Sequence, residues 1–303
     1  MLTGIHFLLT YMCNFECDHC FLYCSPSAKG TFTISQVDQV LEEAEKIGTI
    51  EWIFFEGGEP SLFYPLLLES IRRSSSKGFK VGVVTNAYGI NSREDAVLWL
   101  EPLAKAGLTY LSISNDAFHY GEQVVNNATM AHDAAKELGI DTAMICIDPP
   151  VVEPPEDNSD TDSGEKGQPV VGGNAMFRGR AVETLTKGLP TRPWKDLITC
   201  PYENLESPSR VHIDAFGNVQ ICQGISMGNM WQTPLSELVK AYDPLEHPIC
   251  SSLIHGGPAH LSTYMDQKPS PGYVDECHFC FTVRKEIMDK FPNFLAPGQV
   301  YGI

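Results

Sequence analysis

The sequence predicts an α/β protein: a partial (β/α)6 barrel followed by a small C-terminal cysteine-rich α+β extension. Two observations support this fold class: short apolar segments alternate with longer amphipathic ones up to about residue 176, and cysteines recur after about residue 189. Strands that alternate with helices favour a parallel sheet of right-handed βαβ units. We place the barrel in residues 1–188 and the extension in residues 189–303.

Six short segments rich in apolar residues predict the barrel strands. These segments are 4–11, 51–56, 80–85, 110–114, 142–147 and 170–177. Helical periodicity in the barrel region is found at 34–47, 63–77, 92–105 and 121–138. Thr33 or Ser35 is expected to cap the first helix.

In the extension, 210–222 reads as a hairpin that turns at 215–218, and helices are expected at 234–242 and 276–291. Residues 149–173, which include Pro-Pro-Val-Val-Glu-Pro-Pro, predict a long loop because they contain few apolar side chains. We favour an ordinary solvated insertion there over an active-site lid.

Composition narrows the function classes. The net charge of −17 disfavours nucleic-acid substrates, because nucleic-acid binding depends on Lys and Arg. No apolar run reaches the ~18 residues of a bilayer span, and the first twelve residues lack the basic region of a signal peptide. We therefore expect a cytoplasmic protein without membrane partners, in which ten cysteines indicate metal binding more than disulfides.

Three cysteines, Cys13, Cys17 and Cys20, form a C-x3-C-x2-C run directly after the first predicted strand. This spacing supplies three thiolates to a four-iron cluster and leaves one iron open. Structural zinc usually takes four ligands from two separate pairs, so it fits this run poorly. Cys24 extends the run towards the ferredoxin pattern ending in Cys-Pro, and as a fourth ligand it would leave only an electron carrier. Because the first gap is x3, we favour Cys24 as a free or hydrogen-donating thiol.

A glycine pair follows the second predicted strand, in Gly57-Gly58-Glu59-Pro60. Residues without a Cβ let a ligand approach the backbone closely. Together with the cysteine run, this segment resembles the radical S-adenosylmethionine (radical SAM) superfamily. The resemblance implies that the open iron chelates SAM, that these four residues surround its ammonium group, and that cleavage gives a 5'-deoxyadenosyl radical that abstracts hydrogen from a substrate.

Further residues are expected around SAM. Polar side chains at the ends of the third and fourth strands suit ribose hydroxyls, although helix capping is their ordinary use. They are Asn86, Ser114 and Asp116. Arg178 and Arg180 follow the sixth predicted strand and are expected to present a forked donor to the SAM carboxylate, with a surface pair as the alternative. His19 occupies the position where the family places an aromatic residue near the adenine.

A second set, Cys200, Cys222, Cys277 and Cys280, belongs to the extension. A hairpin and the start of a helix would bring these four thiolates together into a closed metal site. The site could hold zinc or a [4Fe–4S] cluster, and the cysteine spacing does not decide between the two. The set resembles the SPASM/twitch extension of radical SAM enzymes. With four cysteines in place of seven it is closer to twitch, which implies one auxiliary [4Fe–4S] cluster.

The other cysteines have separate interpretations. Cys146, in the fifth predicted strand, is expected to be a small core residue. Cys250, expected in a loop, is a candidate spare ligand or hydrogen donor. The Cys-Ser-Pro continuation at 24–26 resembles radical SAM peptide epimerases, in which a thiol quenches the substrate radical. In some relatives that thiol follows the hairpin ligand, where this chain has Gln223, so an epimerase would need Cys24 or Cys250.

These observations predict a radical SAM enzyme that modifies a peptide by oxidation, cross-linking or epimerisation. The alternatives are a dehydrogenase of amino-sugar alcohols and, from another class, a non-catalytic iron–sulfur electron carrier. Many peptide maturases begin with a recognition domain that is not evident here, whereas the acidic surface suits a basic peptide. The expected reductant is a flavodoxin- or ferredoxin-type protein.

Overall fold

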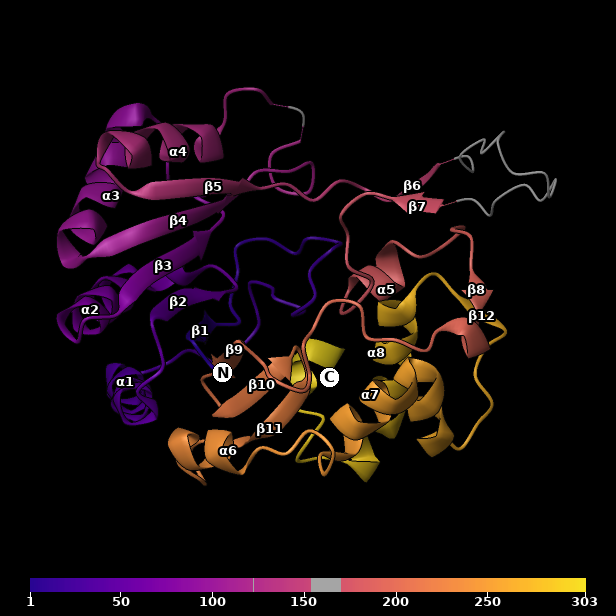
Figure 1. Cartoon of the computed structure of the whole chain (residues 1–303). Coiled ribbons are helices and arrows are strands. Elements are labelled where there is room, and N and C mark those ends of the chain that lie inside the picture. The colour runs from indigo at the N-terminus through magenta and orange to yellow at the C-terminus, as the bar shows by residue number, and fades with distance from the viewer. Residues whose placement is uncertain (122, 154–169) are drawn as a thin grey trace, which may run out of the picture.

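The computed structural model describes residues 1–121, 123–153 and 170–303, which form one eight-stranded sheet, a helical layer on its outer face and a C-terminal helical region (Figure 1). The strand order is β11-β10-β9-β1-β2-β3-β4-β5. The bounds are β1 Gly4–Thr10, β2 Trp52–Gly57, β3 Lys80–Thr85, β4 Leu108–Ser114, β5 Asp141–Ile145, β9 Arg210–Asp214, β10 Asn218–Cys222 and β11 Ile225–Asn229. Strands β1 to β5 and β9 are parallel, and within the described residues the sheet stays open, which confirms the partial barrel.

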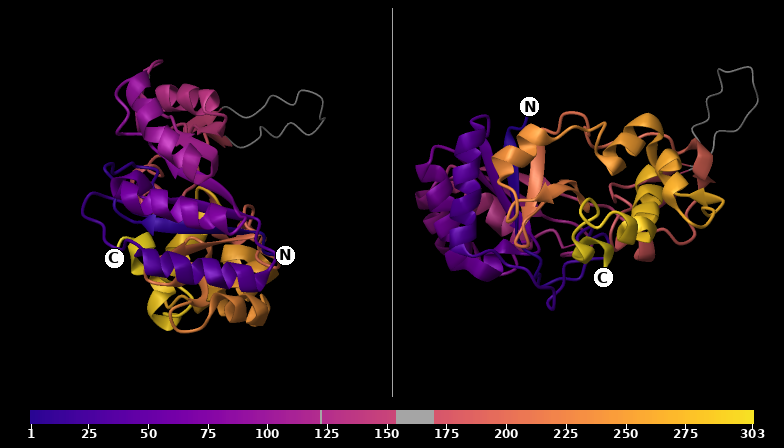
Figure 2. Two further views of the ribbon diagram at one scale, coloured as in Figure 1. Left: turned by 90° about the vertical axis from the view of Figure 1, so that its left-hand side faces the viewer. Right: turned by 90° about the horizontal axis from the view of Figure 1, so that it is seen from below.

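Four helices cover the outer face of the sheet (Figure 2). They are α1 (Ile34–Ile47), α2 (Tyr64–Ser76), α3 (Arg93–Ala106) and α4 (Asn127–Glu137). Thr33 caps α1 through a capping box with Gln36, whereas Ser35 lies inside the helix. The helix expected from residue 121 begins only at Asn127, because the Asn126 side chain caps that end.

The pleat of β1 separates the helix-covered face from the concave face. Ile5, Phe7 and Leu9 belong to the large core between the sheet and the helices. Because side chains alternate along a strand, His6 and Leu8 point to the opposite, concave face. The carboxyl ends of the parallel strands lie together at one edge of the sheet, and binding sites of such sheets gather at that edge.

The sixth parallel strand is not the one predicted at 170–177. Residues Val170–Gly172 form β7, which pairs antiparallel with β6 (Val151–Glu153) in a separate ribbon. The place beside β1 is taken by β9, which pairs parallel with it. The hairpin predicted at 210–222 is confirmed as β9 and β10, so the sheet continues across the boundary that we predict at residue 188.

The C-terminal region contains four helices, α5 (Ala181–Thr184), α6 (Leu235–Ala241), α7 (Pro248–Leu261) and α8 (Glu276–Ile287), and a small β8–β12 ladder (Arg192–Pro193 and Gly272–Tyr273). Helices α7 and α8 enclose a second apolar core, whereas α6 packs with α1 at the main core of the sheet. Short 3₁₀ turns occupy Pro60–Phe63, Trp194–Asp196, Ser262–Tyr264, Met288–Lys290 and Gly298–Tyr301. The expected helices at 234–242 and 276–291 are confirmed, whereas α7 was expected as a loop.

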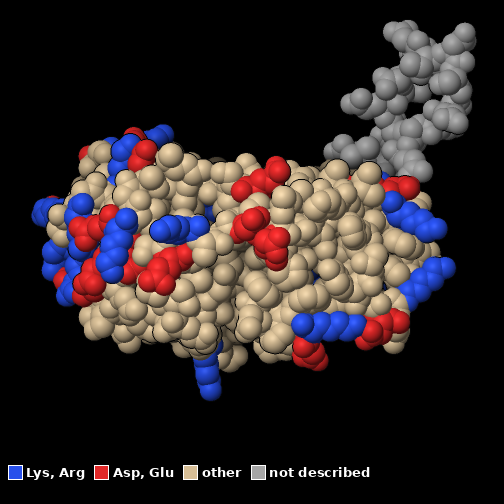
Figure 3. All heavy atoms as spheres, turned by 60° about the horizontal axis from the view of Figure 1, so that its bottom comes forward, with Lys and Arg blue, Asp and Glu red and all other residues tan. Residues whose placement is uncertain are grey.

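Two other expectations concern the segment after β5. Cys146 is exposed directly beyond that strand and is not a core residue, which corrects the prediction from sequence. The middle of the loop predicted at 149–173 lies outside the described residues. None of the helices in the described part of the chain combines the length and the apolar character needed to cross a bilayer. On the face in Figure 3, Lys and Arg side chains lie interspersed with Asp and Glu.

Candidate functional site

The cysteine run lies in the loop that leaves β1 at the carboxyl edge of the sheet. Cys13, Cys17 and Cys20 line one cavity of about 450 Å³, and all three thiols are free. The loop is held by the Arg180 guanidinium, which donates to the backbone carbonyls of Cys17 and Cys24 at 2.8 Å each. The three cysteines that the sequence singled out are therefore brought together around one space.

The glycine pair forms another part of the wall of this cavity. The backbone N–H of Gly58 donates to the carbonyl of Thr10 at 2.7 Å, and that of Glu59 donates to the carbonyl of Met12 at 2.9 Å. A Cβ on Gly58 would lie 2.1 Å from the Met12 carbonyl oxygen, and one on Gly57 would lie 2.4 Å from that of Thr10. Glycine is required here because the segment after β2 lies directly against the strand end that leads to Cys13.

Glu59 does not face the cavity. Its carboxylate is fully buried and accepts hydrogen bonds from the N–H of Ser61 (2.9 Å), the hydroxyl of Thr85 (2.8 Å) and the N–H of Asn86 (2.7 Å). Both oxygens are therefore engaged in joining the end of β2 to the end of β3. The predicted contact between this carboxylate and a SAM ammonium group is replaced by a positioning role, and Pro60 begins the 3₁₀ turn behind it.

Two of the polar residues predicted at strand ends do line the cavity. Asn86 and Ser114 are both at its wall, and the Asn86 amide donates to Asn14 at 2.9 Å and approaches the Cys13 sulfur at 3.8 Å. Asp116 instead lies behind the wall, where its carboxylate is 2.7 Å from Nδ1 of His119 and accepts the N–H of Phe118.

His119 was not identified from the sequence. Its Nε2 lies 3.5 Å from the Cys17 sulfur, and its ring lines the cavity. The i, i+3 spacing of Asp116 and His119 is the signal in the sequence that could have identified it. His19 also lines the cavity, 4.6 Å from the Phe118 ring, and burial lowers its pKa to about 4. It is therefore neutral at pH 7 and presents a flat aromatic face.

The thiols of the run suit a cationic metal centre. Burial raises the pKa of Cys13 to about 11 and that of Cys17 to about 12, so both are protonated at neutral pH when no cation is bound. A hydrogen bond from Cys24 is the main reason that the pKa of Cys20 is lowered to about 6. Iron binding replaces such thiol protons and satisfies the buried sulfurs. The donor set, the cavity and the glycine wall fit an iron–sulfur cluster with a small ligand beside it.

Cys24 lines the same cavity but is almost completely buried. Its thiol lies beside that of Cys20, and this contact together with burial raises the pKa of Cys24 well above its ordinary value. A protonated thiol deep in the loop is consistent with a group that holds a hydrogen atom, and its ligation state is tested below.

The second cysteine set also converges. Cys200, Cys222, Cys277 and Cys280 line one pocket between the β10 hairpin strand and the start of α8. Sequence reasoning therefore singled out all four cysteines that line this pocket. The thiols are free, and burial raises the pKa of Cys277 and of Cys280, the latter to about 11.

Two buried arginines accompany these four thiols. Arg178 donates to the Cys222 sulfur at 3.1 Å and lies 3.6 Å from the Glu203 carboxylate, and Arg284 donates to the Gln223 carbonyl at 2.7 Å. Both side chains line the pocket, and the Nε atom of each is buried without a hydrogen-bond partner. Among the described residues, Glu203 is the one carboxylate that pairs with either guanidinium group, and it also pairs with Arg210. The two buried cations therefore require further negative charge. Four thiolates around a metal centre would supply it.

The roles expected for Arg178 and Arg180 at the SAM carboxylate are wrong, because neither side chain lines the first cavity. Arg178 is turned to the second cysteine pocket and Arg180 holds the cysteine loop from behind. The misassignment follows from the sixth strand: without a barrel strand at 170–177, these residues do not stand at a strand end.

Cys250 lies in the first turn of α7 and is fully buried. It packs in the same core as Cys222 and lines neither cavity. Burial raises its pKa to about 12. Its position supports a core role more than that of a thiol facing a substrate.

Comparisons with known proteins agree with this geometry. Residues 7–161 match the radical SAM superfamily. A 125-residue segment is 27% identical to the tungsten-containing aldehyde ferredoxin oxidoreductase cofactor-modifying protein of Pyrococcus furiosus, covering 41% of this chain and 33% of that protein. A 107-residue segment is 26% identical to the putative peptide biosynthesis protein YydG of Bacillus subtilis, covering 35% of this chain and 34% of that protein. The match thus spans about a third of each curated relative.

A solved structure shares the architecture. BtrN in complex with AdoMet and 2-DOIA superimposes with a TM-score of 0.50 at 16% sequence identity, covering 79% of this chain and 82% of that one. At this identity the likeness concerns the fold, which extends beyond the matched sequence segment into the C-terminal region.

Proposed function

Since the chain belongs to the radical SAM superfamily, we propose that Cys13, Cys17 and Cys20 ligate the [4Fe–4S] cluster of this enzyme class and that the cavity beside them holds SAM. The chemistry that this pair of cofactors supplies is one-electron cleavage of SAM and hydrogen-atom abstraction. The observation that carries the proposal is that the three thiols and the glycine wall border a single cavity.

The residues around the cavity position the ligand. Gly57 and Gly58 line the cavity with backbone atoms alone, and their carbonyls are the proposed acceptors for the ammonium group of SAM. Glu59 keeps this segment against β3 through its three hydrogen bonds. Asn86 and Ser114 offer polar groups to ribose hydroxyls, and the neutral ring of His19 offers a face to adenine.

The second pocket is proposed to hold an auxiliary [4Fe–4S] cluster on Cys200, Cys222, Cys277 and Cys280. A cluster with four thiolates carries net negative charge, and the two buried arginines beside the pocket supply the matching positive charge. Such a centre would accept an electron from a substrate radical or help to hold the substrate. Iron content is the direct test, because a zinc site would add no iron.

The substrate is proposed to be a peptide, which this enzyme would oxidise, cross-link or epimerise. Similarity to the putative peptide biosynthesis protein YydG supports this class, and the net charge of −17 favours a basic partner. A flavodoxin- or ferredoxin-type protein is proposed as the reductant. The runner-up substrate class is a small amino-sugar alcohol.

The first experiment measures SAM cleavage. Protein purified and reconstituted without oxygen is reduced with dithionite and supplied with SAM, and 5'-deoxyadenosine is quantified by mass spectrometry. We expect the product to form with the native chain and to be absent when Cys17 is replaced by Ser. An iron–sulfur carrier without catalysis would give no 5'-deoxyadenosine with either protein.

The second experiment identifies the substrate. A short precursor peptide encoded beside the gene is synthesised with deuterated residues and incubated with the reduced enzyme and SAM. Transfer of deuterium into 5'-deoxyadenosine, with a mass change in the peptide, supports peptide modification. Transfer from a deuterated amino-sugar alcohol, with none from the peptide, would contradict it.

A further inference from the structure

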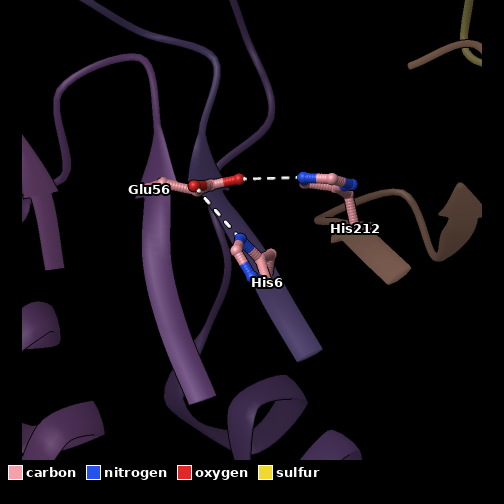
Figure 4. A group of neighbouring side chains, drawn as sticks. All are labelled: His6, Glu56 and His212. Carbon is pink, nitrogen blue, oxygen red and sulfur yellow. Dashed lines mark ion pairs between the residues drawn. The ribbon is translucent and has the colours of Figure 1, made fainter. Parts of the chain in front are cut away.

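Three side chains on the concave face of the sheet have no part in the proposed cluster or SAM contacts: His6 of β1, Glu56 of β2 and His212 of β9 (Figure 4). In the register of the sheet, His6 lies directly opposite His212, and Glu56 lies opposite Leu8, two residues further along β1. Since residues i and i+2 share a face, the three side chains meet above the same surface.

Their ligand-type atoms converge. Nδ1 of His6 lies 3.3 Å from Oε2 of Glu56, and Nε2 of His212 lies 3.2 Å from Oε1 of the same carboxylate. One ligand atom from each residue lies within 4.8 Å of the other two. Figure 4 shows the carboxylate between the two imidazoles, with each ring turned towards a different oxygen. Yet Nδ1 of His6 is buried and makes no hydrogen bond.

Within the described part of the chain, no permanently positive side chain neutralises the Glu56 carboxylate. Among the described residues, the ion-pair partners of Glu56 are these two imidazoles, and no Lys or Arg approaches its carboxylate. Burial raises the pKa of Glu56, but His6 and His212 outweigh that effect and hold it below its ordinary value. Burial lowers the pKa of His212. A metal ion bound here would require an ionised carboxylate and neutral imidazoles.

We propose that His6, Glu56 and His212 bind one divalent first-row transition-metal ion. Two imidazoles and one carboxylate form a donor set used for such ions, and three protein ligands leave coordination positions for water or a substrate atom. Glu56 lines the cavity that also contains the cysteine run, so the ion faces the proposed SAM site.

The surroundings fix the ligands in place. The His6 ring stacks on Phe54 with centroids 4.7 Å apart and an angle of 17°, which restrains its rotation. His212 is almost fully buried. A comparable group, His19, Asp116 and His119, touches Cys17 and belongs to the site already described.

The test is zinc retention by the reconstituted protein. The native chain and the variants Glu56→Gln, His6→Gln and His212→Gln are equilibrated by dialysis against Zn²⁺ alone, and bound zinc is measured by elemental analysis. All the cysteines remain in every variant, so zinc on stray thiols contributes equally to each sample. The matched control is His132→Gln, which removes a histidine 3.3 Å from a single carboxylate, Asp133, outside the group.

We expect the native chain and His132→Gln to retain one zinc ion per chain more than Glu56→Gln, His6→Gln and His212→Gln. Equal zinc in all samples would overturn the proposal. Iron content and circular dichroism establish that each variant is folded, and Glu56→Gln, which keeps the side-chain shape, suffices if a histidine variant is not. SAM cleavage measured in parallel separates the two proposals, because retained zinc does not depend on it.

Discussion

The two cysteine sites use similar ligands in different surroundings. The N-terminal three thiols border a cavity of about 450 Å³ that is also lined by the backbone of Gly57 and Gly58. The C-terminal four thiols are enclosed between a hairpin and a helix, with Arg178 and Arg284 buried beside them. Three ligands beside a cavity leave space for a reacting molecule, whereas four ligands and matched charge make a closed centre.

The comparison teaches that cysteine number alone does not assign a role. The two sites differ in what lies beside the sulfurs. At the N-terminal site it is a cavity, and at the C-terminal site it is buried guanidinium groups. An open site is suited to binding and chemistry, and a closed site to structure or electron transfer. The following variants test this division.

The largest expected effect separates the cleavage of SAM from the second site. Cys17→Ser removes one of three ligands, so we expect 5'-deoxyadenosine formation to fall below detection. Cys222→Ser is expected to retain SAM cleavage without substrate while losing about four iron atoms per chain, the content of one cluster. Cys146→Ser, at an exposed cysteine outside both sites, is the control. Loss of cleavage in Cys222→Ser would show that the sites are not independent.

The next effect concerns the buried charge. Arg284→Met keeps much of the side-chain length but removes the cation, so we expect the C-terminal site to lose metal and the protein to lose about 3 kcal/mol of stability. Iron analysis and denaturant unfolding measure the two losses. Lys285→Met, at the exposed neighbour on the same helix, is the control. Full iron content in Arg284→Met would contradict the charge argument.

A smaller effect is expected at the glycine wall. In Gly58→Ala the new methyl group would lie 2.1 Å from the Met12 carbonyl oxygen, so the backbone must shift next to Cys13. We expect a loss of about 2 kcal/mol in stability and weaker SAM binding. Gly89→Ala adds a methyl group where nothing lies within 4 Å and serves as the control. Unchanged SAM affinity in Gly58→Ala would show that the backbone at Gly58 does not contribute to SAM binding.

The smallest effect is expected at Cys24. Cys24→Ala removes a buried thiol at a cost of about 1 kcal/mol, and we expect the iron content and the electron paramagnetic resonance of the reduced cluster to stay as in the native protein. A native cluster signal that SAM does not perturb, together with a changed signal or a lower iron content in Cys24→Ala, would mean that Cys24 is the fourth ligand. In that event the N-terminal site would be closed as well, and the contrast between the two sites would disappear.

Most local features of the fold were predictable. The strand at Lys80–Thr85 and the helix at Ile34–Ile47 have the predicted bounds, because both combine clear periodicity with strong end signals. The α7 helix was missed because Gly256, Gly257 and Pro258 interrupt its pattern, and the structure shows non-helical backbone at both glycines. Helix-breaking residues conceal a kinked helix from a periodicity argument.

Some of the site residues were likewise predictable from the sequence, and others were not. All seven cysteines that we propose as metal ligands were singled out from the sequence, and each group lines one cavity. Glu59 was expected to contact SAM, whereas its buried carboxylate accepts hydrogen bonds from Thr85 and Asn86, which depend on the neighbouring strand. His119 and the arginine positions needed the fold, because their partners are distant in the chain.

By itself, the sequence determined the chemistry of the donors: a C-x3-C-x2-C run, a glycine pair and four later cysteines, all short-range patterns of residue type and spacing. Only the tertiary structure decided what faces them. The parallel pairing of β9 with β1 placed His212 opposite His6 and turned Arg178 to the second pocket. Such neighbours depend on strand order and register, which arise from packing across the whole sheet and leave no local signal in the chain.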